Sequence, residues 1–439
     1  MAALVNGRLE GGGDSVKITG VSHDTRSLKK GDLFVAIRGP RFDGHRFLGK
    51  AARKGAKAAL VSRPQKASGM AQVVVKDATG ALGDLGRAQR LQWNGPVVAV
   101  TGSVGKTTVK DMAAHLISGS RRVLKTEGNL NNQFGLPLTL LRLDRRHEAA
   151  VVELGINHPG EMGRLSEIAR PDVAVVTAIG EAHLGFFQGR KHLAAEKLKV
   201  GAGMREGGTM VLNADDPFLK AAGRGALTFG LGAGTVRAKN IRTEGLQTRF
   251  TLSAGGFRRE TALSMPGVHN VRNALAAVAA GWALGIPMEA LAGRLRTFKP
   301  QAAMRMEAKR VRGVLFLNDA YNASPTSMEA ALRTFRELKT SGRKIAVLGD
   351  MLELGAFSPE SHRKVLRQAF GAGFDFLVLV GGRMRGAFRV LGSRGTTEAA
   401  CFGDAAQAGV FLKKRLKKGD AVLLKGSRAV GMEKILEVF

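Results

Sequence analysis

Short runs of β-branched and small apolar residues recur along the chain and alternate with stretches of helical periodicity. Runs of this kind are typical of strands that a parallel sheet buries on both faces. Those after the first 92 residues are 97–100, 149–153, 173–177, 209–213, 314–318, 345–348, 376–380 and 421–424. The first 92 residues show a smaller version of the pattern, with strands expected at 16–21, 31–37 and 58–61 and a helix at 46–54. The alternation predicts an α/β protein.

Breaks in this pattern divide the chain into three parts. Trp93-Asn-Gly-Pro96 has the turn-forming residues of a domain junction, and a new series of strands begins after residue 298. A chain of 439 residues is long enough for two or three domains. We therefore expect a small α/β N-terminal domain (1–92), a central domain with a doubly wound, mostly parallel sheet (93–298) and a Rossmann-like α/β C-terminal domain (299–439).

The strand at 97–100 runs directly into a glycine-rich loop and a helix, in the sequence TGSVGKTT (101–108). Strand, glycine turn and helix start together predict a phosphate cradle, or P-loop, in which backbone N–H groups and the helix N-terminus face the anion. Val100 stands where the pattern G-x-x-x-x-G-K-[ST] has glycine, so this loop is the shorter G-x-x-G-K-T-T. A glycine-rich turn with an unrelated lysine is the alternative, which the flanking strand and helix disfavour.

Each part of this loop has an expected role. Lys106 is expected to reach the terminal phosphates of a nucleotide, and Thr107 to place its hydroxyl on Mg²⁺. The expected nucleotide contacts in the loop are Gly102, Ser103, Val104, Gly105, Lys106, Thr107 and Thr108.

Polar side chains follow the predicted strands, where catalytic groups of such sheets lie. Glu153 ends one strand and His183 comes shortly after the next. A carboxylate and an imidazole at the mouth of a P-loop sheet suit a second divalent ion, beyond the one expected on Thr107. A histidine that caps a loop is the alternative for His183.

The charge balance is strongly basic, with 68 lysines and arginines against 36 acidic residues and a net charge of +32. Such a charge suggests nucleic acid as a partner. However, the basic residues are scattered, and only 5% of the residues are aromatic, which is poor material for base stacking. A polyanionic small substrate or an arginine-rich proteome explains the charge equally well.

The single cysteine, Cys401, excludes an intramolecular disulfide and fits a reducing compartment. The sequence has no apolar run long enough to span a membrane, and its first residues lack the layout of a signal peptide. The cytoplasm is therefore the expected location.

Taken in order, these motifs resemble the Mur ligases of peptidoglycan precursor synthesis over nearly the whole chain. Residues 101–108, 128–132, 153–161 and 182–184 are similar to blocks that the family shares. Residues 319–328, 347–355 and 425–428 resemble the branch that adds a dipeptide. Residues 22–26 and 43–45 are similar to the uridine-binding domain of the last two ligases of the pathway, although ordinary turn chemistry explains these residues as well.

The resemblance implies an ATP-dependent ligase that joins D-alanyl-D-alanine to UDP-N-acetylmuramoyl-tripeptide (UDP-MurNAc-tripeptide). ATP would phosphorylate the terminal carboxylate of the tripeptide, and the dipeptide amine would attack the acyl phosphate to give the pentapeptide, ADP and phosphate. ATP and two Mg²⁺ ions are the implied cofactors, and a monomer is expected.

Three alternatives remain open. The meso-diaminopimelate- or lysine-adding ligase is the first, although its Asp-Asn-Pro-Arg block is not visible. A relative of folylpolyglutamate synthetase and a nucleic-acid-binding P-loop ATPase are the other two.

The resemblance also implies roles for single residues. The implied catalytic residues are Lys106, Glu153, His183, Lys197 and Arg305, and the implied metal-holding residues are Thr107, Glu153, His183 and Lys197. Lys197 matches the lysine that relatives carry as a carbamate. Lys199 should point elsewhere, because residues two apart on a helix do not share a face. Gln301-Ala-Ala-Met304 precedes Arg305, where the family often has a glycine.

Further contacts are implied on both substrates. Those for the nucleotide, beyond the loop, are Asn270, Asn273, Arg305 and Asp319. Those for the UDP-MurNAc-tripeptide and the dipeptide are Thr25, Arg26, Asp43, His45, Asn129, Asn132, Asn322, Lys425, Ser427 and Arg428.

Overall fold

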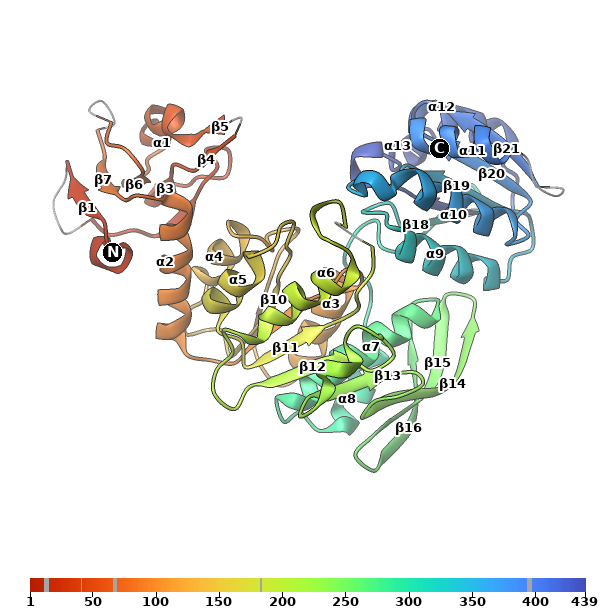
Figure 1. The fold of residues 1–439 in the computed structure, drawn as a ribbon, viewed down its shortest axis with the longest axis horizontal. Helices are drawn as coiled ribbons and strands as arrows, with labels where there is room; N and C mark the ends of the chain where they lie inside the picture. Colours follow the sequence, from red (N-terminus) through yellow and green to blue (C-terminus); the bar gives the residue numbers. More distant parts are fainter. Residues whose placement is uncertain (12–15, 41, 66–68, 182–183, 393–396) are drawn as a thin grey trace.

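Three mixed or mostly parallel sheets follow one another along the chain, each flanked by its own helices (Figure 1). The computed structural model describes residues 1–11, 16–40, 42–65, 69–181, 184–392 and 397–439. The prediction of an α/β protein is confirmed. Within these ranges, the helices lack the combination of length and apolar character that a membrane span needs.

The first sheet has five strands in the order β1-β7-β6-β3-β2, of which only β1 is antiparallel to its neighbour. Its strands are β1 (Arg8–Glu10), β2 (Gly20–Ser22), β3 (Asp32–Val35), β6 (Ala58–Val61) and β7 (Ala71–Val74), and β4 (Arg38–Gly39) pairs with β5 (Phe42–Asp43) as a separate hairpin. The helical segments are η1 (Ala2–Val5), η2 (Gly44–Phe47), α1 (Leu48–Arg53) and α2 (Ala78–Trp93). Helix α2 begins where the Asp77 carboxylate accepts two backbone N–H groups, and it leads to the second sheet.

The second sheet has nine strands in the order β16-β15-β14-β13-β12-β11-β8-β10-β9. They are β8 (Val97–Thr101), β9 (Val123–Lys125), β10 (Ala149–Glu153), β11 (Val173–Val176), β12 (Thr209–Asn213), β13 (Leu227–Gly230), β14 (Val236–Glu244), β15 (Gln247–Ala254) and β16 (Phe257–Leu263). The strands from β9 to β14 pair in parallel. The residues of β8 are fully buried, as its continuous apolar pattern predicts.

Helices cover both faces of this sheet, so that two hydrophobic cores form. One face carries α3 (Lys106–Ile117), α7 (Val268–Ala283) and α8 (Met288–Leu295), and the other carries α4 (Gly135–Leu140), α5 (Glu161–Ala169) and α6 (Arg190–Leu198). The short helical turns are η3 (Leu184–Phe186), η4 (Lys199–Gly201) and η5 (Lys220–Gly223). The doubly wound arrangement predicted for the central part is therefore present from β8 to β13.

The antiparallel meander β14–β15–β16 departs from the prediction that strands and helices alternate up to residue 298. Its strands are joined by short glycine-containing turns at 245 and 255–256, so no crossover helix is needed. On β15, Thr248, Phe250, Leu252 and Ala254 are buried and the residues between them are not. This two-residue period in the sequence was the signal that could have predicted the meander.

The third sheet has six strands in the order β17-β18-β22-β19-β20-β21, with only β17 antiparallel. The strands are β17 (Glu307–Val311), β18 (Val314–Asn318), β19 (Lys344–Gly349), β20 (Phe376–Val380), β21 (Glu398–Phe402) and β22 (Ala421–Lys425). The helices are α9 (Pro325–Glu337), α10 (Ser358–Phe370), α11 (Gly382–Leu391), α12 (Ala405–Arg415) and α13 (Lys434–Glu437), with short turns at η6 (Gly355–Phe357) and η7 (Arg428–Val430). A capping box at Ser324 begins α9.

Candidate functional site

The glycine loop after β8 has the close packing that a phosphate cradle requires. Gly102 has φ +143° and Gly105 has φ +85°, values that favour glycine. A Cβ atom on Gly102 would lie 2.0 Å from Thr177 Oγ1, and one on Gly105 would lie 2.5 Å from Asn273 Oδ1. Ser103 Oγ is buried and has no hydrogen-bond partner among the described residues. The loop therefore leaves an unsatisfied polar atom beside the N-terminus of α3, which suits an anion.

A buried carboxylate lies beside the first turn of α3. Glu153 ends β10, which pairs with β8, and its side chain is 3% exposed. Thr107 donates from Oγ1 to Glu153 Oε2 at 2.8 Å, and Asn131 donates from Nδ2 to Oε1 at 2.8 Å. The structure thus brings together two of the residues predicted to hold metal. Asn131 was not among the predicted site residues, although it lies in the asparagine-rich segment 129–132.

Two lysines face this carboxylate. Lys106 donates from Nζ to Gly102 O at 3.0 Å. Burial lowers the pKa of Lys106, Glu153 opposes the shift, and the positive charge of Arg305 adds to it. Lys197 on α6 is only 1% exposed, and burial followed by the charge of Lys106 holds its pKa well below the usual range. No hydrogen bond or ion pair to the Lys197 ammonium is found in the part of the chain that the structure describes.

Lys199 lies elsewhere, as the helix spacing predicts. Its Nζ is 2.7 Å from Glu196 Oε2 and its side chain is 52% exposed. Glu196 Oε1 also accepts from the backbone N–H groups of Gly160 and Met162. Burial opposes ionisation of Glu196, but Lys199 and these N–H groups hold its pKa below the usual value. The ionised Glu196 therefore anchors α6 on the N-terminus of α5 and keeps Lys197 turned inward.

His183, predicted as a metal ligand, lies outside the described residues. In the described ranges no group of three or more histidine, cysteine, aspartate or glutamate side chains could hold a metal ion. The remaining predicted metal residues, Thr107, Glu153 and Lys197, lie close together. The hydroxyl and carboxylate oxygens among them are hard donors, the kind that Mg²⁺ takes, so the residues present fit that ion.

Arg305 approaches this group from the third part of the chain. It lies between Met304 (φ 58°) and Met306 (φ 53°), and its Cζ is 4.2 Å from the centre of the Tyr321 ring. The Met306 N–H donates to Asp319 Oδ1 at 3.1 Å, which fixes the turn. Met304 thus adopts the left-handed conformation that favours glycine.

A buried ion pair supports the same turn. Lys425, 2% exposed, lies 2.6 Å from Asp319 Oδ2 and also donates to the Asn322 carbonyl at 3.2 Å. Both Asp319 oxygens therefore have protein partners, and its predicted contact with the nucleotide stays a prediction. His269 lies near this pair, and burial lowers its pKa to about 4, against the opposing charge of Asp319.

The asparagines predicted to contact adenosine lie at the start of α7. Asn270 is buried, donates to Pro266 O at 2.8 Å and accepts from Asn273 Nδ2 at 3.3 Å. Asn273 packs against Gly105 of the P-loop. Their place beside the loop fits a nucleotide, and the contact itself stays a prediction.

The predicted substrate residues of the first sheet form two local networks. Asp24 holds Arg26 at 2.6 Å, and this hydrogen bond lowers the pKa of Asp24 to about 2. His45 Nδ1 lies 2.7 Å from Asp43 Oδ1, while its Nε2 accepts from the Ser62 N–H at 3.0 Å. Thr25 is buried beside them. Turn chemistry accounts for the Asp24–Arg26 and Asp43–His45 bonds, whereas the His45–Ser62 bond joins residues 17 positions apart.

A ring contact that was not predicted joins the first two sheets. His23 stacks on Phe134, with ring centroids 6.4 Å apart, at the start of α4. This contact places the loop of residues 22–26 beside the asparagine-rich segment that holds Glu153.

The other predicted substrate residues have mixed surroundings. Asn132 Oδ1 accepts from Phe134 N and Gly135 N and so begins α4, and Asn129 is exposed. Asn322 accepts from the Ala323 N–H, the buried Ser427 hydroxyl accepts from Leu352 N at 2.9 Å, and Arg428 pairs with Glu433 at 2.5 Å. Arg428 also contacts Met304 at 3.3 Å, so the segment 425–428 lies beside the Arg305 turn.

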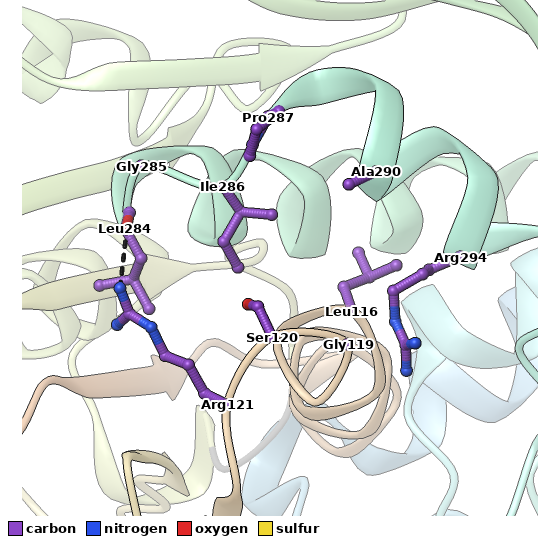
Figure 2. Close-up of a pocket in the computed structure, with 10 residues that line it drawn as sticks. All are labelled: Leu116, Gly119, Ser120, Arg121, Leu284, Gly285, Ile286, Pro287, Ala290 and Arg294. Carbon is purple, nitrogen blue, oxygen red and sulfur yellow. Dashed lines mark hydrogen bonds between the residues drawn. The ribbon is translucent and has the colours of Figure 1, made fainter.

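A cavity of about 310 Å³ lies at the other end of α3 (Figure 2). Its walls are mostly apolar, and Arg121 and Arg294 flank it. Because it lies away from the carboxyl ends of the parallel strands, it is separate from the candidate site.

Three stretches of the chain match Mur ligase families. Residues 17–90 match the Mur ligase family catalytic domain, residues 100–281 the Mur ligase middle domain, and residues 304–428 the glutamate ligase domain of Mur ligases.

Similar proteins extend over nearly the whole chain. The chain is 37% identical to the UDP-N-acetylmuramoyl-tripeptide–D-alanyl-D-alanine ligase of Bacillus subtilis, over 96% of this chain and 93% of that protein. It is 36% identical to the enzyme of the same name from Escherichia coli, over 99% of this chain and 96% of that protein. It also resembles the crystal structure of MurF from Acinetobacter baumannii (TM-score 0.92, 33% identity, 99% and 96% covered). For the MurF ligase from Thermotoga maritima in complex with ADP, the TM-score is 0.87 and the identity is 31%. The match covers 97% of this chain and 98% of that one.

Proposed function

This chain belongs to the Mur ligase family, and from that premise we propose that it joins D-alanyl-D-alanine to UDP-MurNAc-tripeptide at the expense of ATP. The observation that carries the proposal is the convergence of Lys106, Arg305 and the buried Glu153 on the glycine loop. The similarity to ligases named for this reaction, over at least 96% of the chain, supports the same substrates.

The reaction has two steps. A carboxylate oxygen of the tripeptide attacks the γ-phosphorus of ATP, and ADP leaves. The dipeptide nitrogen then attacks the acyl carbon, loses a proton and displaces phosphate. Negative charge gathers on the transferred phosphoryl group, so cations must be in place before the reaction begins. Lys106 from the loop and Arg305 from the third part of the chain supply two such cations.

Mg²⁺ is the metal that the family implies. Thr107 and Glu153 would hold it, with His183 and Lys197 as further proposed partners. When bound, the ion would neutralise phosphate charge. The chain's own contribution is to orient the Glu153 carboxylate, because Thr107 and Asn131 each donate to one of its oxygens.

We propose a carbamate on Lys197. A carbamate forms when the neutral amine adds CO₂ and releases a proton. Burial and the charge of Lys106 favour the neutral amine of Lys197. The product is a long carboxylate-like group, which would offset the positive charge around Glu153 and suit a metal.

The three parts of the chain take separate tasks in this proposal. Residues 1–92 bind the UDP-MurNAc end of the tripeptide, residues 93–298 bind ATP, and residues 299–439 bring Arg305 and the dipeptide. We expect a monomer that acts in the cytoplasm, where ATP is available.

A comparison of nucleotide turnover tests this function against a nucleic-acid-dependent ATPase. The ligase reading predicts that ADP forms only when both UDP-MurNAc-tripeptide and D-alanyl-D-alanine are present. The net charge of +32 motivates the hypothesis of a nucleic-acid-dependent ATPase, which predicts that ADP forms with DNA or RNA alone. Stimulation by nucleic acid and not by the two substrates would contradict the proposal.

A further inference from the structure

The linker between α8 and β17 begins its path against the last turn of α3. Arg294, in the last turn of α8, donates from Nη2 to His115 O at 2.7 Å, and Figure 2 shows Arg294 alongside this end of α3. The ring of Phe298, 3% exposed, packs edge-on against the His115 ring, with centroids 5.6 Å apart. The linker is therefore fixed at the end of α3 that lies away from the P-loop.

The same linker also reaches the first turns of α3. Thr108 and Asp111 line one small cavity together with Gln301 and Arg305. Arg305 lies close enough to Lys106 for its charge to act on that lysine. Residues 294–305 thus run antiparallel to α3, from its last turn to its first.

A group of three polar side chains holds the linker midway. Asp111 is 6% exposed, and its Oδ1 lies 2.8 Å from Lys125 Nζ, which comes from β9. Lys125 also donates to Gln301 Oε1 at 3.0 Å. The linker is therefore joined to the P-loop helix through one buried carboxylate and one ammonium.

The same carboxylate is also connected to Glu153. Lys110, 3% exposed, lies 3.1 Å from Asp111 Oδ1 and donates to Thr126 O at 2.9 Å. The Thr126 hydroxyl accepts from the Glu153 N–H at 3.0 Å. Burying the charges of Lys110 and Asp111 is expensive, and apolar residues could fill the space at least as well. An arrangement that costs stability but fixes geometry points to a positioning role.

The chain changes direction directly after Gln301. Met304 and Met306, on either side of Arg305, both have positive φ. Only three residues lie between Gln301 and Arg305, and each residue of the chain spans at most about 3.5 Å. Holding Gln301 therefore limits where the Arg305 guanidinium can go.

We propose that Asp111, Lys125 and Gln301 form a clamp that holds the linker on the P-loop helix and thereby positions Arg305 beside Lys106. This inference rests on the proposed function, because Arg305 matters as a contact of the γ-phosphate. The three residues act through Arg305 and are positioning residues.

Nucleotide affinities of a Gln301→Ala variant test the clamp. Gln301 is exposed, so the fold should tolerate the change. We expect the affinity for a non-hydrolysable ATP analogue to fall about tenfold, near the upper end for one hydrogen bond. The affinity for ADP should stay unchanged, because ADP lacks the γ-phosphate. Gln301→Glu keeps an acceptor for Lys125, so this variant should bind the analogue as tightly as the unaltered protein does.

Two further variants separate positioning from general destabilisation. Lys299→Ala changes an exposed residue of the same linker and should leave both affinities unchanged. In an Arg305→Ala background, Gln301→Ala should have no further effect, because the clamp acts through that arginine. Equal losses for ADP and the analogue, additive effects in the double variant, or unchanged affinities in Gln301→Ala would each overturn the clamp. Absence of ligation by the unaltered protein would instead contradict the proposed function, since these affinities do not depend on it.

Discussion

The Thr107 hydroxyl donates a 2.8 Å hydrogen bond to Glu153, so the first turn of the P-loop helix is tied to the carboxyl end of the neighbouring strand. Glu153 has a second donor in Asn131 at 2.8 Å and is almost fully buried. A carboxylate that is held on both oxygens has one orientation. The loop and the candidate metal residue therefore form one rigid unit before any substrate binds.

Replacing Lys106 tests the phosphate cradle. Lys106→Ala should lower kcat by about 10³-fold, because one preorganised charge on the transferred group is lost. Its one hydrogen bond found among the described residues goes to the Gly102 carbonyl, so the thermal midpoint should hardly change. The ligation rate and the thermal unfolding midpoint of the variant are both measured, which separates a catalytic from a structural role of Lys106. Loss of the folding transition along with activity would mark Lys106 as structural.

Replacing Glu153 tests the metal assignment. Glu153→Gln removes the charge but keeps the shape, so the Mg²⁺ concentration for half-maximal activity should rise at least about tenfold. Glu148→Gln is the matched control, because Glu148 precedes the other end of the same strand and is exposed. A magnesium titration of each variant measures this. Identical curves for Glu153→Gln and the unaltered protein would remove Glu153 from the metal site.

Two lysines that lie two residues apart, Lys197 and Lys199, test the carbamate. Lys197→Ala should lose nearly all ligase activity, whereas Lys199→Ala should lose little, because Lys199 is half-exposed and pairs with Glu196. Small carboxylic acids should restore part of the rate of Lys197→Ala by occupying the vacated position. Initial rates with and without acetate measure the rescue. Mild and equal effects of both changes would exclude the carbamate from the mechanism.

The depressed pKa of His269 predicts a pH dependence of stability. Burial, with Lys425 nearby, lowers its pKa from 6.5 to about 4 in the folded protein, although Asp319 opposes the shift. The neutral form is favoured by folding, so its contribution is complete above pH 6.5 and is lost as the pH falls toward 4. The loss should be about 3 kcal/mol. His269→Gln should therefore show a smaller fall of its thermal midpoint between these pH values, and parallel curves would contradict the assignment.

The sequence predicted the strands of the parallel sheets well because their apolar runs are continuous. β6, β10, β12, β18 and β20 have the bounds expected from the pattern. Short edge strands such as β1 and β9 have three residues each and carry no comparable signal. The meander β14–β16 was missed because its segment was assumed to continue the βα pattern, although β15 alternates buried and less buried positions.

The sequence predicted the site residues that belong to a recognisable motif. It did not predict the site residues that are brought together only by tertiary packing. Lys106, Thr107 and Glu153 could be placed because the loop and the strand end are visible in the sequence. Asn131, Asp111 and Lys125 have no motif of their own, since each becomes relevant only when α3, β9 and β10 lie side by side. Asp43 and His45 are the opposite case. Both were predicted to contact substrate, and the structure shows that their side chains form a hydrogen bond with each other.

Product formation with a panel of amino substrates tests whether this protein ligates the dipeptide D-alanyl-D-alanine. The purified protein is incubated with ATP, Mg²⁺ and UDP-MurNAc-tripeptide, and D-alanyl-D-alanine, meso-diaminopimelate, L-lysine or L-glutamate is added in turn. We predict UDP-MurNAc-pentapeptide with D-alanyl-D-alanine alone, detected by mass, with one ADP released for each pentapeptide. Ligation of another amino acid in place of the dipeptide, or ADP release without a ligated product, would contradict it.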